Sequence, residues 1–249
     1  MELRRLSIFL LFILLTNTVS LHAQPKNGED VIRAMYCKYH DSWYKNITFV
    51  QNTIFYGRNG NVEREQLWYE AISLPGKLAI KFDELDSPNG ILFADGVQYG
   101  FANGTLMQQV DRVHDLLVLG FNVYHQEPKI TISQLTENGY DFSQMYEDNW
   151  NDRPVYVIGV SKPDSTIPQI WIDKERLIFV RNLTIGRADT IQEIQFNNYE
   201  RIAGGWIAPT VLFMANGTIG LKEEYSQITI PDTLDARIFV PETFIDSSW

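Results

Sequence analysis

The sequence predicts a mainly β (α+β) fold in a single domain, and three observations support this prediction. Between residues 46 and 109, apolar side chains alternate with polar ones at a period of two, as in strands that pack on one face. Dipeptides that favour tight hairpins separate these runs, so the strands should be antiparallel neighbours: Asn89-Gly90, Asp95-Gly96 and Asn103-Gly104. A few short segments with helical spacing complete the pattern.

The first 23 residues resemble a secretory signal peptide. Arg4 and Arg5 precede an apolar stretch at 6–15 that is about ten residues long, which is too short to span a bilayer. Polar residues follow, and we expect cleavage after Ala23. The sequence therefore predicts an exported protein in which residues 24–249 form the mature domain.

The single cysteine, Cys37, does not follow the expected cleavage position, so we expect no lipidated N-terminus. One cysteine cannot form an internal disulfide, and we expect Cys37 to be a small buried or half-buried apolar residue. No later apolar stretch approaches the roughly 18 residues of a membrane-spanning helix, so we expect no transmembrane segment in the mature chain.

An amphipathic helix is expected from about Asn27 to His40. Asn27 can cap the first turn, where Glu29 and Asp30 place negative charge favourably for the helix dipole. Apolar residues then recur at helical spacing from Ile32 onward. Two shorter helices are expected in the middle of the chain, at 114–124 and at 128–137.

Long strands are expected at 46–56 and 62–73, on either side of a Gly- and Asn-rich turn. Beyond the middle helices the strand pattern resumes, with further strands expected at 155–160, 167–172, 177–183, 190–201, 206–214 and 219–230. A single helical turn is expected at 234–239, before Pro241.

The sequence contains no pattern typical of a metal site, a cofactor site or a nucleophilic enzyme. The histidines at 40, 114 and 125 lack metal-ligand spacing, and no phosphate-binding or dinucleotide-binding glycine motif is present. We therefore expect no catalytic residue, no metal and no cofactor. The net charge of −10 disfavours nucleic acid as a partner.

Paired acidic residues leave one enzymatic alternative open, a secreted hydrolase that uses two carboxylates. The pairs are expected at turns and strand ends, as solvated surface charge: Glu63/Glu65, Asp83/Glu84/Asp86, Glu147/Asp148 and Glu223/Glu224. Aromatic residues make up 13% of the chain. They either fill a core or line an apolar cavity, and composition alone does not separate the two.

Several segments resemble the LolA-type lipoprotein carriers. The resemblance covers 68–78, the stretch from Asn89 to Tyr99 with its Asp95-Gly96 turn, and the late segment from Asp235 to Pro241. It implies a curved antiparallel half-barrel sheet with helices that cover the concave face. Family members often carry an arginine before the proline that ends the second strand, where it helps to hold a lid; this chain has Leu74 there.

The resemblance also implies that an apolar cavity with few charges shields acyl chains. The residues expected to line it lie on two strands and on the first middle helix: Leu78, Ile80, Phe82, Val97, Tyr99, Phe101, Leu116, Leu117 and Phe121. An acyl chain cannot cross an aqueous space alone, because each buried CH₂ is worth about 0.8 kcal/mol.

The implied function is that of a periplasmic carrier which moves lipid or lipoprotein acyl chains toward the outer membrane. The implied partners are those acyl chains, with inner-membrane export machinery and an outer-membrane acceptor as candidates, and we expect a monomer. A second hypothesis is an envelope sensor on the same fold, which binds acyl groups and a protein partner. The carboxylate hydrolase is the third.

Overall fold

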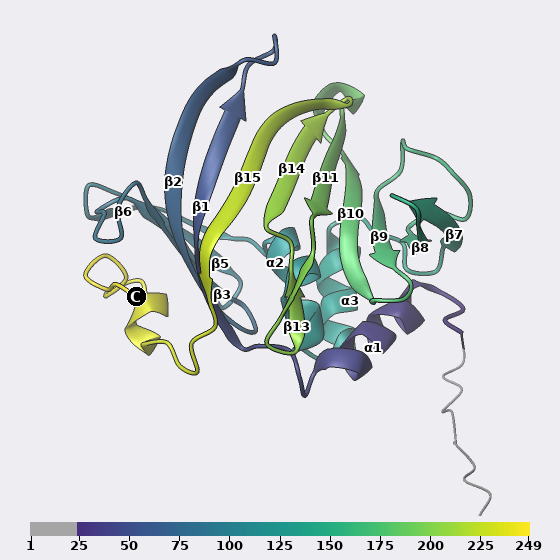
Figure 1. Cartoon of the computed structure of the whole chain (residues 1–249), viewed down its shortest axis with the longest axis horizontal. Coiled ribbons are helices and arrows are strands. Elements are labelled where there is room, and N and C mark those ends of the chain that lie inside the picture. Colours follow the sequence, from purple (N-terminus) through teal and green to yellow (C-terminus); the bar gives the residue numbers. More distant parts are fainter. Residues whose placement is uncertain (1–23) are drawn as a thin grey trace, which may run out of the picture.

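The computed structural model describes residues 24–249, and the expected signal peptide at 1–23 lies outside the described residues. The described part is dominated by one large antiparallel sheet, which is curved and open and carries helices α1, α2 and α3 on its concave side (Figure 1). This arrangement confirms the expected mainly β fold with a half-barrel sheet and helices on its concave face.

The large sheet has 13 strands in the order β6-β5-β4-β3-β2-β1-β15-β14-β11-β10-β9-β8-β7. Their bounds are β1 Asn46–Tyr56, β2 Val62–Ser73, β3 Lys77–Phe82, β4 Gly90–Ala94, β5 Val97–Ala102, β6 Thr105–Asp111, β7 Met145–Trp150, β8 Arg153–Ile158, β9 Gln169–Asp173, β10 Ile178–Ile185, β11 Ile191–Asn197, β14 Thr210–Ala215 and β15 Thr218–Thr229. A separate hairpin joins β12 Glu200–Ile202 to β13 Gly205–Ile207.

Two of the three Asn/Asp-Gly dipeptides form the predicted tight hairpins, whereas Asn89-Gly90 does not: Gly90 begins β4 and pairs with Lys81, and the longer loop 83–89 joins β3 to β4. Asp95 and Gly96 have φ values of 53° and 81°, and they connect β4 to β5 with Ala94 opposite Val97. Asn103 and Gly104 connect β5 to β6 in the same way. Left-handed φ at both central residues gives a turn whose twist matches that of the strands, so Asp95-Gly96 and Asn103-Gly104 each close a tight hairpin.

The helices are α1 Gly28–Tyr39, α2 Asp115–Gly120 and α3 Pro128–Glu137, with short 3-10 turns η1 Asn122–Tyr124, η2 Arg187–Asp189 and η3 Ala236–Phe239. The Asn27 side chain accepts a hydrogen bond from the Asp30 amide at 3.0 Å, which confirms the expected cap. The buried face of α1 includes Ile32 and Met35, and it packs with α3 and η1 into a core shared with the sheet.

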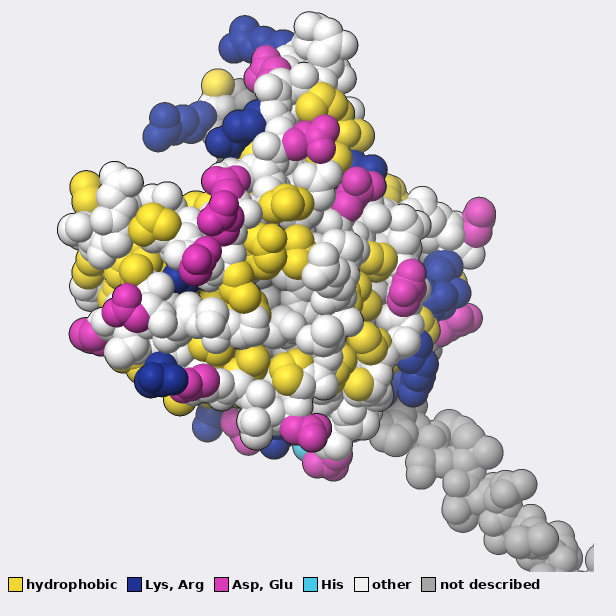
Figure 2. Space-filling model, turned by 60° about the vertical axis from the view of Figure 1, so that its left-hand side comes forward, with side chains coloured by type: hydrophobic (Ala, Val, Ile, Leu, Met, Phe, Trp, Pro, Cys, Tyr) yellow, Lys and Arg dark blue, Asp and Glu magenta, His cyan; other side chains and the backbone are white. Residues whose placement is uncertain are grey.

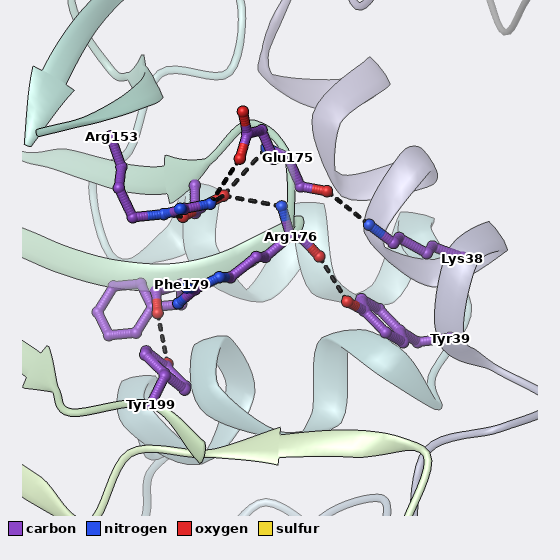
Figure 3. A network of polar contacts seen from close by, with 8 residues as sticks. Lys38, Tyr39, Arg153, Glu175, Arg176, Phe179 and Tyr199 are labelled. Atoms are coloured by element: carbon purple, nitrogen blue, oxygen red, sulfur yellow. Dashed lines mark hydrogen bonds and ion pairs between the residues drawn. The ribbon is translucent and has the colours of Figure 1, made fainter. Parts of the chain in front are cut away.

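Helix α1 is fixed to the sheet through the turn between β9 and β10 (Figure 3). Lys38 Nζ donates to the Glu175 carbonyl at 2.7 Å, and the Tyr39 hydroxyl donates to the Arg176 carbonyl at 2.5 Å. The turn itself is organised by the buried Asp173, which pairs with Arg153 and accepts from the amides of Glu175 and Arg176. Because this network is local and dense, we expect α1 to stay in place.

The C-terminal segment covers the convex face of the sheet at the β2–β5 end. Phe244 is fully buried and packs against Phe101, with their ring centroids 5.1 Å apart. Lys81 is also fully buried, and its ammonium donates to the carbonyls of Ser87 and Ile245. Figure 2, which brings this side of the molecule forward, shows hydrophobic side chains in separate groups among polar and acidic ones. Strands β3 and β4 are therefore largely buried on both faces.

Three expectations differ from the structure. Strand β7, with the polar sequence Met-Tyr-Glu-Asp-Asn-Trp, was not predicted, because it lacks the usual apolar alternation. The expected strands 190–201 and 206–214 are each broken, and their pieces form the separate hairpin β12–β13. Cys37 is exposed rather than buried or half-buried, because it lies on the outer face of α1.

Candidate functional site

A cavity of about 790 Å³ lies between the concave face of the sheet and the segment 111–117, which leads from the end of β6 into α2 and is called the strap below. Strands from β3 across to β10 contribute side chains to it, and α3 adds residues at one edge. The volume lies within the range of roughly 300–1,000 Å³ that is usual for small-molecule sites.

Much of the cavity wall is apolar, because the alternation of each strand sends one set of side chains to the concave face. The register places Ile72 on β2 opposite Leu78 on β3, and Ile80 is next to it on the same face. The apolar lining residues are Phe49, Trp68, Ile72, Leu78, Ile80, Val113, Leu116, Leu117, Phe121, Ile194, Phe196 and Phe213.

The wall also contains a polar patch, formed by Glu70, Gln51, Glu223 and Tyr225 and called the acidic floor below. Glu70 on β2 and Glu223 on β15 flank β1, where Gln51 lies opposite Tyr225. Glu70 and Glu223 are only 6% and 9% exposed. The Tyr225 ring stacks on Phe49, with a centroid distance of 4.3 Å, which fixes the hydroxyl of Tyr225 beside Glu223.

The two carboxyl groups have different surroundings. Glu223 accepts a hydrogen bond from the Tyr225 hydroxyl at 2.9 Å. Burial raises the pKa of Glu223 to about 7, and hydrogen bonds from Tyr225 and Gln51 oppose that rise. Glu70 lies between Trp68 and Ile72 along its strand and opposite Phe49 and Ile80 on the neighbouring strands. Burial, with a smaller contribution from the charge of Glu223, raises its pKa well above the ordinary value.

Within residues 24–249, no group donates a hydrogen bond to the Glu70 carboxyl group, which borders the cavity. A second acceptor in the same cavity is also unsatisfied: the Asn182 side chain is 2% exposed and donates to the Tyr140 hydroxyl at 2.9 Å, while Asn182 Oδ1 accepts nothing from the described chain. Buried polar groups without partners are uncommon and costly in proteins. The unpartnered groups that face the cavity are thus both acceptors.

The strap and α3 contribute three acidic side chains to the cavity wall. Asp111 and Asp115 lie on the strap, Glu137 lies on α3, and Arg112 is the one basic side chain among the described residues that line the cavity. Burial and the nearby charge of Arg112 lower the pKa of His114 to about 4, and a backbone hydrogen bond opposes this shift. His114 Nδ1 accepts from the Leu117 amide at 3.3 Å, so this histidine caps α2 in its neutral form.

Five of the nine predicted lining residues border this cavity: Leu78, Ile80, Leu116, Leu117 and Phe121. Phe82 is on the same strand face as Leu78 and Ile80, but it packs against Trp68 at a ring distance of 5.1 Å and does not border the cavity. That these side chains bind a ligand stays a prediction.

The remaining three predicted residues, all on β5, lie on the other side of the sheet. Phe101 and Tyr99 belong to the convex cluster beneath the C-terminal segment. Val97 lies opposite Ala94, which is also in that cluster. Alternation groups these three residues correctly on one face, but it does not tell which face is concave.

The acidic floor was missed from sequence, and the cavity is more charged than expected. The sequence places Glu223 among the solvated surface charges and makes no prediction for Glu70. Strand alternation could have revealed both residues, because side chains two positions apart lie on the same face of a sheet. Glu70 is two residues from Trp68 and from Ile72, and Glu223 is two residues from Leu221 and from Tyr225. Among residues 24–249, no cluster of His, Cys, Asp and Glu has the arrangement of a metal site.

Comparison with protein-family models finds no match, and comparison with curated proteins finds none. Solved structures do match. A Vibrio parahaemolyticus domain described as an outer membrane lipoprotein-sorting protein aligns with a TM-score of 0.63 at 13% identity, over 88% of this chain and 98% of that one. A DUF1329 family protein from Desulfovibrio piger aligns with a TM-score of 0.59 at 15% identity, over 86% and 96% of the two chains.

A LolA superfamily protein from Nitrosomonas europaea aligns with a TM-score of 0.55 at 11% identity, over 85% of this chain and 98% of that one. Over the described range, no helix is both long and apolar enough to cross a membrane. The curved sheet, the helices on its concave face and these alignments together show that the chain has the LolA-like fold.

Proposed function

We propose that the protein is an exported periplasmic carrier that shields the acyl chains of a lipid or lipoprotein in the cavity beneath the strap. The observation that carries the proposal is the cavity of about 790 Å³ on the concave face of the sheet, whose walls include twelve apolar side chains. Transfer of about a dozen methylenes from water into such walls is worth roughly 10 kcal/mol. That is enough to hold an acyl chain away from water without covalent chemistry.

The strap is the element best placed to admit and release a ligand. It borders the cavity through Val113, Leu116 and Leu117 and leads into α2, which has only six residues. Helix α1, in contrast, is tied to the β9–β10 turn by the network around Asp173. Opening of the strap would therefore expose the cavity while the rest of the helical layer stays attached to the sheet.

The buried carboxyl pair does not favour the hydrolase alternative. A carboxylate-based glycosidase needs one ionised and one protonated carboxyl group, which requires surroundings that move their two pKa values apart. Here burial raises the pKa of both Glu70 and Glu223. Glu70 also lies opposite apolar residues on both neighbouring strands.

The proposal is tested by titration of the mature protein with Nile red, a neutral dye that fluoresces when it is transferred to apolar surroundings. Thr184→Trp should block binding, because Thr184 on β10 borders the cavity. Thr105→Trp, at an exposed position on β6, is the matched control and should bind as the wild type does. A wild type that binds no dye, or two variants with equal affinity, would contradict the proposal.

A further inference from the structure

Shielding of acyl chains does not require the buried carboxyl groups of the acidic floor, so these groups point to a further property of the ligand. Glu70 is 6% exposed, it borders the cavity, and the described chain supplies no hydrogen bond to its carboxyl group. Its neighbours on the sheet are apolar, so the sheet offers no counter-charge. A buried carboxyl group in such a position is costly unless something pairs with it.

Most of the ionisable side chains around the cavity are acidic. Five acidic side chains border the cavity, against Arg112 as the one basic side chain among the described lining residues. A ligand that carries a carboxylate or a phosphate would meet repulsion in these low-dielectric surroundings, whereas a cation would be attracted. The unsatisfied Asn182 Oδ1 is a further acceptor and favours a ligand with hydrogen-bond donors.

We propose that the natural ligand is an amphiphile with a protonated amine, whose ammonium group donates to Glu70 while its hydrocarbon chain lies along the apolar walls. The inference rests on the proposed carrier function and specifies its ligand class. The charge of Glu223 strengthens the site, because Glu223 lies on the same sheet face across β1. The elevated pKa of Glu70 agrees with this assignment, since it describes the cavity without the cation that would stabilise the ionised carboxylate.

Three single-chain compounds of equal length separate the possibilities: decylamine, decanol and decanoate. Each is used to displace Nile red from the wild-type protein near neutral pH, below its micelle concentration. We expect decylamine to bind about tenfold or more tightly than decanol, because a charge-assisted hydrogen bond in a buried site outweighs that of a neutral hydroxyl. Decanoate should bind most weakly.

Glu70→Gln should reduce the preference for decylamine over decanol to about onefold. Glu224→Gln is the matched control, because Glu224 is adjacent to Glu223 but on the opposite face, where it pairs with Lys222. It should keep the full preference.

The outcomes test the amine assignment separately from the carrier proposal. Nile red that binds and is displaced equally by all three compounds overturns the amine assignment and leaves the carrier proposal standing. A preference that survives Glu70→Gln also overturns it. Absence of Nile red binding overturns the carrier proposal and the amine assignment together. The comparison of the three compounds uses the wild type alone, so it decides the question even if Glu70→Gln does not fold.

Discussion

Replacement of Glu223 by glutamine should change how stability depends on pH. Burial raises the pKa of Glu223 from an ordinary value of 4.5 to about 7. The folded state therefore binds a proton that the unfolded state releases between these two pH values. The stability contributed by this group is fully present below pH 4.5 and is lost as the pH rises through about 7.

The magnitude follows from the difference between the two pKa values. At about 1.4 kcal/mol for each pH unit, the wild type should lose about 3 kcal/mol from this group between pH 4 and pH 8. Glutamine has nearly the same shape as glutamate but does not titrate, so the stability of Glu223→Gln should not fall in this way between pH 4 and pH 8. Removal of the Glu223 charge also relieves Glu70, and this acts in the same direction.

Urea denaturation of both proteins between pH 4 and pH 8 measures the effect. The two free energies of unfolding should be similar at pH 4, and the variant should be more stable by about 3 kcal/mol at pH 8. Other titrating groups, such as His114, are common to both proteins and cancel in the difference. A difference that does not vary with pH would refute the assignment of a buried carboxyl group to the acidic floor.

Three further changes test the rest of the structure. Asp173→Ala should cost about 3 kcal/mol or more in urea denaturation, because it removes one of the two ion pairs of Arg153 and leaves two turn amides without their acceptor. Glu200→Ala, at an exposed position, should stay within about 0.5 kcal/mol of the wild type. Phe244→Ala should cost about 3–5 kcal/mol of stability, because the Phe244 ring is buried in the convex cluster. The folded variant should bind Nile red as the wild type does, because that cluster lies on the other face of the sheet from the cavity. Loss of binding without loss of stability would contradict this. Cys37 should react with a thiol reagent in the folded protein, and Cys37→Ser should cost less than about 1 kcal/mol; a protected thiol would show that α1 presents another face.

The strands and hairpins were largely predictable, because their signals are local. The Asp95-Gly96 turn and the alternation around it place β4 and β5 correctly, and most expected strands agree with the structure to within about two residues. Strand β7 was not predictable in this way. Its polar residues become a strand because β8 offers them a free edge to pair with, which is a tertiary effect.

About half of the residues predicted to line the cavity do line it, because strand alternation carries only part of the necessary information. Alternation assigns residues to faces but does not say which face is concave. Leu78 and Ile80 face the cavity, while Tyr99 and Phe101 face a second cluster that exists because the distant C-terminal segment folds back over them. Glu70 was overlooked because an acidic residue is normally exposed, although its spacing from Trp68 placed it on the apolar face.

The central claim is that the cavity holds acyl chains, and mass spectrometry of organic extracts tests it most directly. The protein is purified natively from its own cell envelope, together with the Thr184→Trp and Thr105→Trp variants. The account predicts acylated compounds in the extracts of the wild type and of Thr105→Trp, and a clear depletion in the extract of Thr184→Trp. Extracts without acylated compounds, or with equal amounts from all three proteins, would contradict it.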